Sequence, residues 1–148
     1  MEPLKKLLEE FWVWAGICKE EYATLCDSDL EPFYYPAFDA LREACKMRIN
    51  TSLKPDEIDD FLTCMALDNE EEILLDWCKT IADDRFLEVL VRSGSCHLQF
   101  HARWQIAELL RCRTLPNRDA ILTELAADPH EYVRKRAKNA IAYIKELI

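Results

Sequence analysis

The chain has only two glycines, Gly16 and Gly94, among 148 residues. Tight hairpin turns and phosphate-binding loops depend on glycine, because it adopts backbone angles that other residues avoid. The sequence also lacks Asn-Gly and Asp-Gly pairs and any sustained alternation of apolar and polar residues, which are the signals of hairpins and strands. These absences predict an all-α protein without a glycine-rich nucleotide site.

Sequence motifs of common enzymes are absent as well. There is no Gly-x-Ser-x-Gly and no His-Glu-x-x-His, so nothing marks a nucleophile elbow or a zinc-protease helix. The three histidines, His97, His101 and His130, could each meet a carboxylate in space, as in any protein of this size. We therefore expect a protein that is not an enzyme and that holds no cofactor.

The cysteines are odd in number and scattered, and no two form a Cys-x-x-Cys pair. Disulfide frameworks are typical of clustered, even-numbered cysteines in secreted chains, so we predict free thiols in a reducing cytosol. Cys96, His97 and His101, with Cys112 further along, lack the close ligand pairs of zinc sites, and we predict no metal there. The longest apolar run, residues 11–18, is far shorter than the ~20 residues that span a membrane. With no secretory signal at the N-terminus, we expect a cytoplasmic protein that does not bind a membrane.

Residues 117–147 read as two amphipathic helices joined by an Asp-Pro turn at Asp128. The second carries small residues, Ala137 and Ala140, on its apolar stripe, and the short turn predicts that the two helices pack antiparallel. The same pattern occurs 60 residues earlier without a gap, and a looser copy lies between the two. The identical pairs are Leu62 and Leu122, Thr63 and Thr123, Ala66 and Ala126, Asp68 and Asp128, and Glu71 and Glu131.

This pattern resembles the second half of a HEAT-type repeat, in which small residues let paired helices approach closely. The resemblance implies antiparallel helical hairpins stacked as a short HEAT-like α-solenoid that binds other macromolecules. We expect one domain over residues 1–148, with an N-terminal helical pair at 1–52 and HEAT-like pairs at 53–82, 83–113 and 114–148. Upstream, the pattern predicts helices from Pro3 to about Leu25 and from Pro36 to Ile49, a break between them at residues 26–32, and a helix starting at Pro55.

Charge is unevenly distributed along the chain, which has a formal net charge of −9. Residues 56–84 contain eleven acidic residues and a single basic one, Lys79, so this segment alone exceeds the net charge of the whole chain. One interpretation is that the acids favour helix starts and keep the protein soluble. The other is that they form a docking surface for a cationic protein. We define the acidic belt by its six expected members: Asp59, Asp60, Glu70, Glu71, Glu72 and Asp76.

Aromatic residues concentrate in the first forty positions. On the first predicted helix, Trp14 falls on the apolar stripe and is expected to be buried. Trp12 lies at the edge of that stripe, so burial and exposure both remain open for it. If exposed, Trp12 would be a candidate anchor for a partner, because interface energy concentrates in a few aromatic residues.

The expected function is therefore protein binding. Size, charge and architecture are similar to those of small acidic immunity proteins, which suggests an inhibitor that neutralises a basic toxin such as a nuclease. The alternative is an adaptor or assembly subunit that recognises a helix or peptide. A helical-repeat nucleic-acid binder is the third possibility, based on Trp77, Trp104 and Arg103, but acidic residues repel phosphates.

Overall fold

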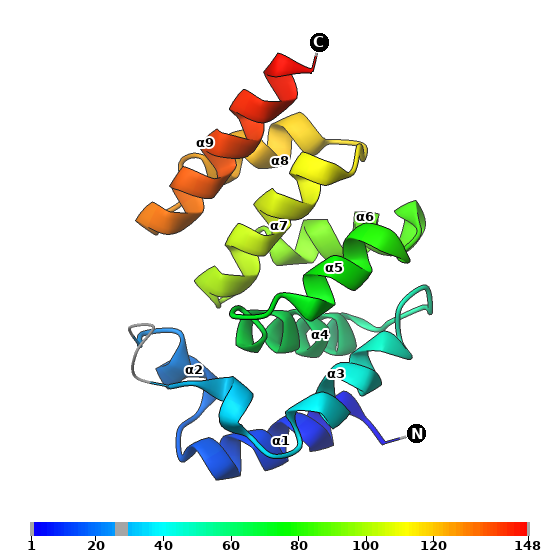
Figure 1. Ribbon diagram of the computed structural model, residues 1–148, viewed down its shortest axis with the longest axis vertical. Coiled ribbons are helices and arrows are strands. Elements are labelled where there is room, and N and C mark those ends of the chain that lie inside the picture. Colours follow the sequence, from blue (N-terminus) through cyan, green and yellow to red (C-terminus); the bar gives the residue numbers. More distant parts are fainter. Residues whose placement is uncertain (1, 26–29, 148) are drawn as a thin grey trace.

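The computed structural model describes residues 2–25 and 30–147 (Figure 1). Within these ranges the chain forms nine α-helices and one 3-10 helix, with no strand, so the predicted all-α class is confirmed. The elements are α1 (Leu4–Ala15), α2 (Lys19–Tyr22), η1 (Pro32–Tyr34), α3 (Phe38–Lys46), α4 (Pro55–Leu67), α5 (Ile73–Thr80), α6 (Asp84–Gly94), α7 (Phe100–Cys112), α8 (Arg118–Leu125) and α9 (Glu131–Glu146).

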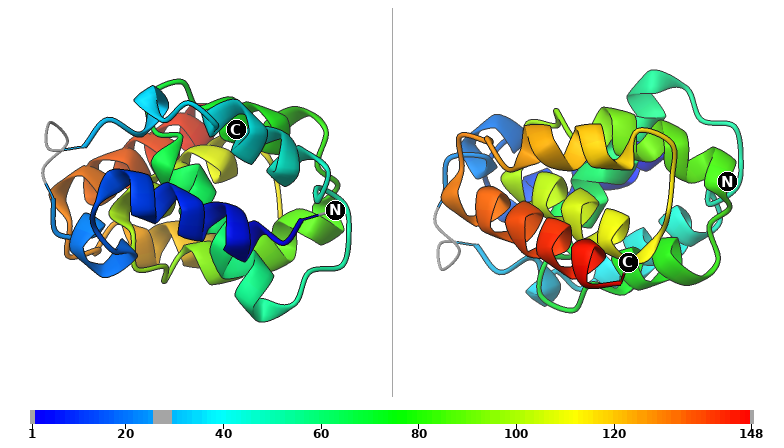
Figure 2. Two further views of the ribbon diagram at one scale, coloured as in Figure 1. Left: turned by 90° about the horizontal axis from the view of Figure 1, so that it is seen from below. Right: turned by 90° about the horizontal axis from the view of Figure 1, so that it is seen from above.

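The helices follow one another along the long axis of the molecule, with α1 at one end and α9 at the other (Figure 1). Helix α1 packs against α3 and α4, and α4 packs against α6 and α7. Helix α5 packs mainly against α3 and α7, and α7 makes its most extensive contact with α9. Seen from its two ends, the molecule presents α1 on one side and the adjacent helices α8 and α9 on the other (Figure 2).

Helices α4 and α7 form the centre of the hydrophobic core. Over part of their length, side chains on every face of these two helices are buried, as expected of a helix surrounded by others. Burial is continuous from Phe61 to Asp68 around the end of α4 and from Trp104 to Leu110 in α7. A fully buried polar side chain of α7, Gln105, donates a hydrogen bond from Nε2 to the Met65 carbonyl of α4 at 2.7 Å.

Small residues on α9 allow its close approach to α7. Ala137 and Ala140 are fully buried, and they lie on one stripe with Val133 and Ile144. A methyl side chain occupies little space between two helix axes. The predicted position of these alanines at a helix–helix contact is therefore confirmed.

The aspartates aligned by the 60-residue offset play the same structural part in two places. Asp68 binds Arg42 of α3, with 2.6 Å between Oδ1 and Nη2, and its Oδ2 accepts the Leu74 backbone N–H. Asp128 binds Arg103 of α7, with 2.8 Å between Oδ2 and Nε, and its Oδ1 accepts the backbone N–H of residue 130. Both carboxylates are buried. Asp68 therefore attaches the turn after α4 to α3, and Asp128 attaches the turn after α8 to α7.

The predicted helix from Pro3 to about Leu25 is wrong. Helix α1 ends at Ala15, because Gly16 adopts the left-handed conformation (φ 74°) and its N–H donates to the Trp12 carbonyl. This is a common glycine terminus of helices. Helix α2 then begins at Lys19.

The expected burial of Trp14 is also wrong, because 42% of the residue is exposed. Leu4, Leu8 and Phe11 form the buried stripe of α1. At 100° per residue, Trp14 lies about 90° from the centre of that stripe, while Val13 points directly away from it.

Two further boundaries differ from the sequence analysis. The predicted helix from Pro36 to Ile49 is shorter, since α3 covers only Phe38–Lys46. In the expected break at residues 26–32, positions 26–29 lie outside the described residues, and Pro32 begins η1. The expected helix start at Pro55 is confirmed.

Candidate functional site

The acidic belt is divided between two places. Asp59 and Asp60 lie in the first half of α4, whereas Glu70–Glu72 follow its C-terminal end and Asp76 lies on α5. At 1.5 Å per helical residue, these two groups are about 15 Å apart along α4. The structure therefore brings four members of the belt together, and we call Glu70, Glu71, Glu72 and Asp76 the α4–α5 acidic group.

A single guanidinium next to this group is shared by three carboxylates. Arg42 binds the buried Asp68, and its Nη1 also contacts Asp39 Oδ1 at 3.0 Å. Its Nη2 lies 3.8 Å from Glu71 Oε1. One positive charge is thus surrounded by three negative charges, so this part of the surface keeps a net negative charge.

Glu72 extends the excess of negative charge towards α5. Burial raises the pKa of the Glu72 carboxyl above its ordinary value; the charges of Glu108 and Asp76 add to the shift, and Arg136 and Lys79 oppose it. A raised carboxyl pKa means that the anion is poorly compensated in the folded chain. Glu70 is exposed and, like Asp76, makes no side-chain ion pair among the described residues.

The nearby cations are already engaged by Glu108 on α7. Its Oε1 lies 2.6 Å from Arg111 Nη2 and 3.3 Å from Lys79 Nζ, and its Oε2 lies 3.0 Å from Arg136 Nη2. Although burial alone raises the pKa of Glu108, the hydrogen bonds from Arg111 and Arg136 and the charge of Lys79 lower it to about 2. These three cations outnumber the single negative charge of Glu108, and two of them, Arg136 and Lys79, also lower the pKa of Glu72. The negative charge of the α4–α5 acidic group is therefore partly balanced on the side of Glu72.

Asp59 has partners within the chain. Its Oδ1 lies 3.0 Å from His97 Nε2, and its Oδ2 lies 3.8 Å from Lys19 Nζ. The other ring nitrogen, His97 Nδ1, accepts the Gln99 backbone N–H at 3.1 Å, and burial lowers the pKa of His97. With both ring nitrogens engaged, the pair fixes the segment before α7 against α4.

Asp60 is partly buried among other acids. Burial raises the pKa of its carboxyl, and the charges of Asp59 and Asp56 add to the shift, while those of Lys19 and Lys5 oppose it. A cation brought to this position would relieve the repulsion. Asp60 remains a candidate contact, separate from the α4–α5 acidic group.

An aromatic hollow that sequence reasoning missed opens beside Glu70. It has a volume of about 660 Å³. The Phe100 and His130 rings stack with their centroids 3.7 Å apart, and the Tyr132 ring meets Trp104 edge to face at 5.6 Å. These residues come from α7, from α9 and from the residue before α9, so no local motif could reveal their proximity. The described residues that line the hollow are Ala23, Thr24, Leu25, Asn69, Glu70, Phe100, His101, Trp104, His130 and Tyr132.

Trp12, the predicted anchor, is half-buried. Its ring centroid lies 5.0 Å from that of Phe11 and 5.9 Å from that of Tyr22. The Tyr22 hydroxyl in turn accepts a hydrogen bond from Asn69 Nδ2 at 3.3 Å, next to Glu70. Trp12 therefore packs within the chain and retains only part of its surface for a partner.

The residues that suggested nucleic-acid binding, Trp77, Trp104 and Arg103, all contact other side chains of the same chain. Trp104 is only 3% exposed, and Arg136 lies 4.5 Å above its ring. Arg103 is bound to Asp128, and the Lys46 ammonium lies 4.9 Å from the Trp77 ring centroid. None of these arrangements leaves a cationic surface next to an open aromatic face.

Across residues 2–25 and 30–147, no three His, Cys, Asp or Glu side chains are grouped as a metal ion requires. In the same part of the chain, no helix combines the length and the apolar character needed to cross a membrane.

Comparison of the chain with protein-family models, curated proteins and solved structures gave no match.

Proposed function

We propose that this chain is a protein-binding module, without enzymatic activity, that docks a cationic protein on the α4–α5 acidic group. The observation that carries the proposal is the charge imbalance around Arg42, which faces Asp39, Asp68 and Glu71 at once. Opposed potentials accelerate encounter and favour the correct orientation. A basic partner would supply the missing positive charge.

The aromatic hollow supports the same kind of partner. Its rim carries the carboxylate of Glu70, and its walls present the rings of His130 and Tyr132. Arginine and lysine side chains bind both to carboxylates and to aromatic faces. We infer that one basic side chain of the partner enters this hollow while others meet Glu71 and Asp76.

We also infer a HEAT-like arrangement of the helices. In this interpretation, α3, α5, α7 and α9 form one row and α1, α4, α6 and α8 the other. The contacts α3–α5, α5–α7 and α7–α9 support the first row, and α1–α4 and α4–α6 support part of the second. The recurrence of an Arg-bound aspartate at the 60-residue offset supports it further, because repeat units reuse their interactions.

Among cationic partners, we favour a basic toxin such as a nuclease, which the chain would neutralise as an immunity-type inhibitor. A nuclease must hold phosphates, so its active cleft is rich in arginine and lysine. An acidic surface of preformed geometry can cover such a cleft. The second candidate is an adaptor that recognises a peptide or helix, and the size of the aromatic hollow, about 660 Å³, favours it.

The test is affinity capture followed by binding kinetics. The wild type is compared with the variant Glu70→Lys, Glu71→Lys, Glu72→Lys. The matched control carries the same charge change at three exposed acids elsewhere: Glu20→Lys, Glu124→Lys and Glu146→Lys. We expect the wild type and the control to capture a basic protein from native lysate, and the variant to bind it at least tenfold more slowly at low salt.

Capture of an acidic partner, or equal association rates for the variant and the control, would contradict the proposal. If the captured protein is an enzyme whose activity the wild type suppresses, the inhibitor role is supported. If its activity is unchanged, the adaptor role is supported.

A further inference from the structure

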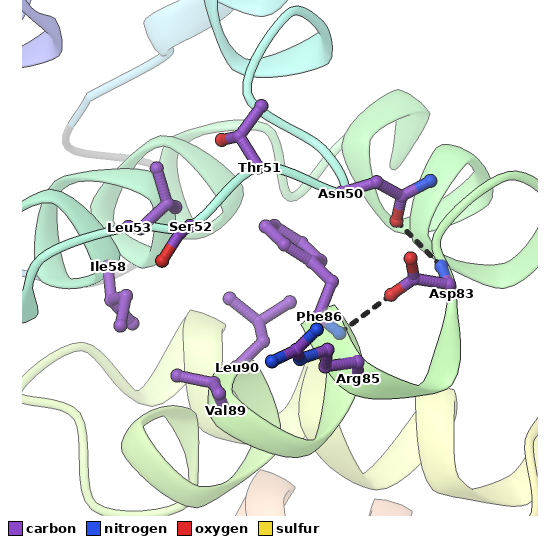
Figure 3. Close-up of a pocket in the computed structure, with 10 residues that line it drawn as sticks. All are labelled: Asn50, Thr51, Ser52, Leu53, Ile58, Asp83, Arg85, Phe86, Val89 and Leu90. Carbon is purple, nitrogen blue, oxygen red and sulfur yellow. Dashed lines mark hydrogen bonds between the residues drawn. The ribbon is translucent and has the colours of Figure 1, made fainter.

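A second pocket lies on a different face of the molecule, between the turn before α4 and helix α6 (Figure 3). Its volume is about 340 Å³, at the lower end of the range for small-ligand sites. None of the acidic belt residues lines it. The lining residues are Asn50, Thr51, Ser52, Leu53, Ile58, Asp83, Arg85, Phe86, Val89 and Leu90.

The floor of the pocket is apolar. Ile58 of α4 and Phe86 and Leu90 of α6 are buried core residues that direct part of their surface into the pocket. Leu53 and Val89 continue this surface towards the mouth, and Val89 is 44% exposed. Such a floor favours the apolar part of a ligand.

One wall of the pocket is held in place by hydrogen bonds. Asn50, in the left-handed conformation (φ 68°), donates from Nδ2 to the Ile81 carbonyl at 2.9 Å. Its Oδ1 accepts the Asp83 backbone N–H at 2.7 Å. Asp83 Oδ1 accepts the Phe86 backbone N–H at 2.8 Å, which caps α6. The pocket is therefore preformed, and a ligand would not have to order it.

Arg85, which is exposed and lines the pocket, carries a positive charge that a ligand can reach at the mouth of the pocket. Its side chain extends past Phe86 towards Leu90 (Figure 3), and among the described residues it has no hydrogen bond or ion pair. Neither neighbouring acid forms an ion pair with it: Asp84 binds Arg113 at 2.7 Å, and Asp83, which also lines the pocket, accepts the Phe86 backbone N–H through Oδ1. Arg85 can therefore form an ion pair with an anionic group of a ligand at this mouth.

We propose that this pocket binds a carboxylate attached to a small apolar group, such as a phenyl or branched alkyl group. The apolar group occupies the floor formed by Ile58, Phe86 and Leu90, and the carboxylate accepts charge-assisted hydrogen bonds from Arg85. The Ser52 hydroxyl, on the opposite side of the mouth, is a second possible donor. Both a free carboxylic acid and the C-terminal residue of a peptide present this chemistry.

The experiment uses hydrocinnamate as the probe and its neutral amide as the control ligand, titrated into isotopically labelled protein and followed by NMR. We expect saturable shifts of amides in the pocket, including those of Ser52, Val89 and Leu90. We expect the amide to bind at least about tenfold more weakly, because it lacks the charge that Arg85 recognises.

Two variants test the role of the guanidinium. Arg85→Gln should remove the preference for hydrocinnamate over its amide. Arg92→Gln, at an exposed arginine two turns further along α6, should leave it unchanged. Equal binding of acid and amide by the wild type, or an unchanged preference in Arg85→Gln, would overturn the proposal.

A third ligand separates the two sources of the carboxylate. A tripeptide ending in phenylalanine is compared with its C-terminally amidated form. Tighter binding of the free-carboxylate peptide than of hydrocinnamate assigns the pocket to a chain terminus. Binding of hydrocinnamate alone assigns it to a small molecule, and binding of neither contradicts the proposal.

Discussion

Gly94, the last residue of α6, lies where α4, α6 and α7 meet, and its replacement by alanine tests this packing directly. A Cβ atom at this position would lie 2.5 Å from Ile106 Cγ1, 2.6 Å from Ile106 Cδ1 and 3.0 Å from Leu62 Cδ2. Carbon atoms in contact are normally about 3.5–4.0 Å apart. Ile106 and Leu62 are both fully buried, so neither can move into solvent.

The expected change in the free energy of unfolding on Gly94→Ala is the sum of two opposed effects. Alanine in a helix is favoured over glycine by about 1 kcal/mol, because glycine has more freedom to lose on folding. Overpacking a closed core costs about 1–3 kcal/mol. Since the overlap is about one ångström at both Ile106 atoms and about half an ångström at Leu62, we expect the upper part of that range and a net destabilisation of about 1–2 kcal/mol. For a chain of this length, that lowers Tm by about 3–8 °C.

The assay is urea unfolding followed by circular dichroism, in a double-mutant cycle with Ile106→Ala. Removing the Ile106 side chain alone should cost about 2–5 kcal/mol. In its absence, Gly94→Ala should become neutral or stabilising, so the two changes should couple by about 1–2 kcal/mol. Gly16→Ala is the control: Gly16 has a left-handed backbone but nothing within 4 Å of its Cβ position. It should destabilise the chain without coupling to Ile106.

A neutral Gly94→Ala would refute the close approach of α6 to α7. The same conclusion would follow if Gly94→Ala cost as much in the Ile106→Ala background as in the wild type.

Two further predictions concern ionisation and thiol chemistry. The folded chain lowers the pKa of Glu108 to about 2 from an ordinary 4.5, so the stability that this carboxylate contributes is present above pH 4.5 and is lost as the pH falls towards 2. Glu108→Gln should therefore reduce the fall in Tm over this pH range, by an amount equivalent to at most about 3 kcal/mol. If the acid unfolding profile of the variant equals that of the wild type, the ion cluster around Glu108 is contradicted. Among the cysteines, burial raises the pKa of Cys78 to about 12 and that of Cys64 well above its ordinary value. Because maleimide reacts with the thiolate, a brief treatment of the native chain should label only the exposed thiols. Peptide mass mapping identifies the labelled positions. Among the described residues, the buried thiols are Cys45, Cys64 and Cys78, and the exposed ones are Cys18, Cys96 and Cys112; Cys26 lies outside the described residues. Equal labelling of both sets before denaturation would show that the core is open.

Periodicity in the sequence predicted the contacts that depend on local spacing. Ala137 and Ala140 were placed at a helix contact because they recur on the apolar stripe of one helix. The 60-residue offset marked Asp68 and Asp128 as equivalent. It could not reveal Arg42 and Arg103 as their partners, because each arginine lies about 25 residues before its aspartate on a separate helix and carries no periodic signal.

The candidate site was harder to predict for the same reason. A count of charges along residues 56–84 treats Asp60 and Glu70 as neighbours, although Asp60 lies in the first half of α4 and Glu70 beyond its C-terminal end, about 15 Å away. The aromatic hollow joins α7 to the start of α9, and only packing places Phe100 on His130. The break after α1 depends on one residue, Gly16, and a single glycine within a helical pattern is compatible with either a continuous helix or a helix end.

The buried contact between Arg42 and Asp68 has a consequence for the rate of release of a partner. Asp68 directly precedes the turn that carries Glu70–Glu72, and it also holds the Leu74 N–H at the start of α5. The backbone of this turn is therefore rigid before any partner arrives, and little conformational entropy is lost on binding. Loosening it with Asp68→Asn would leave every exposed carboxylate in place. The variant also removes one buried negative charge, so the encounter rate should fall slightly, and the lifetime of the complex should shorten by a larger factor.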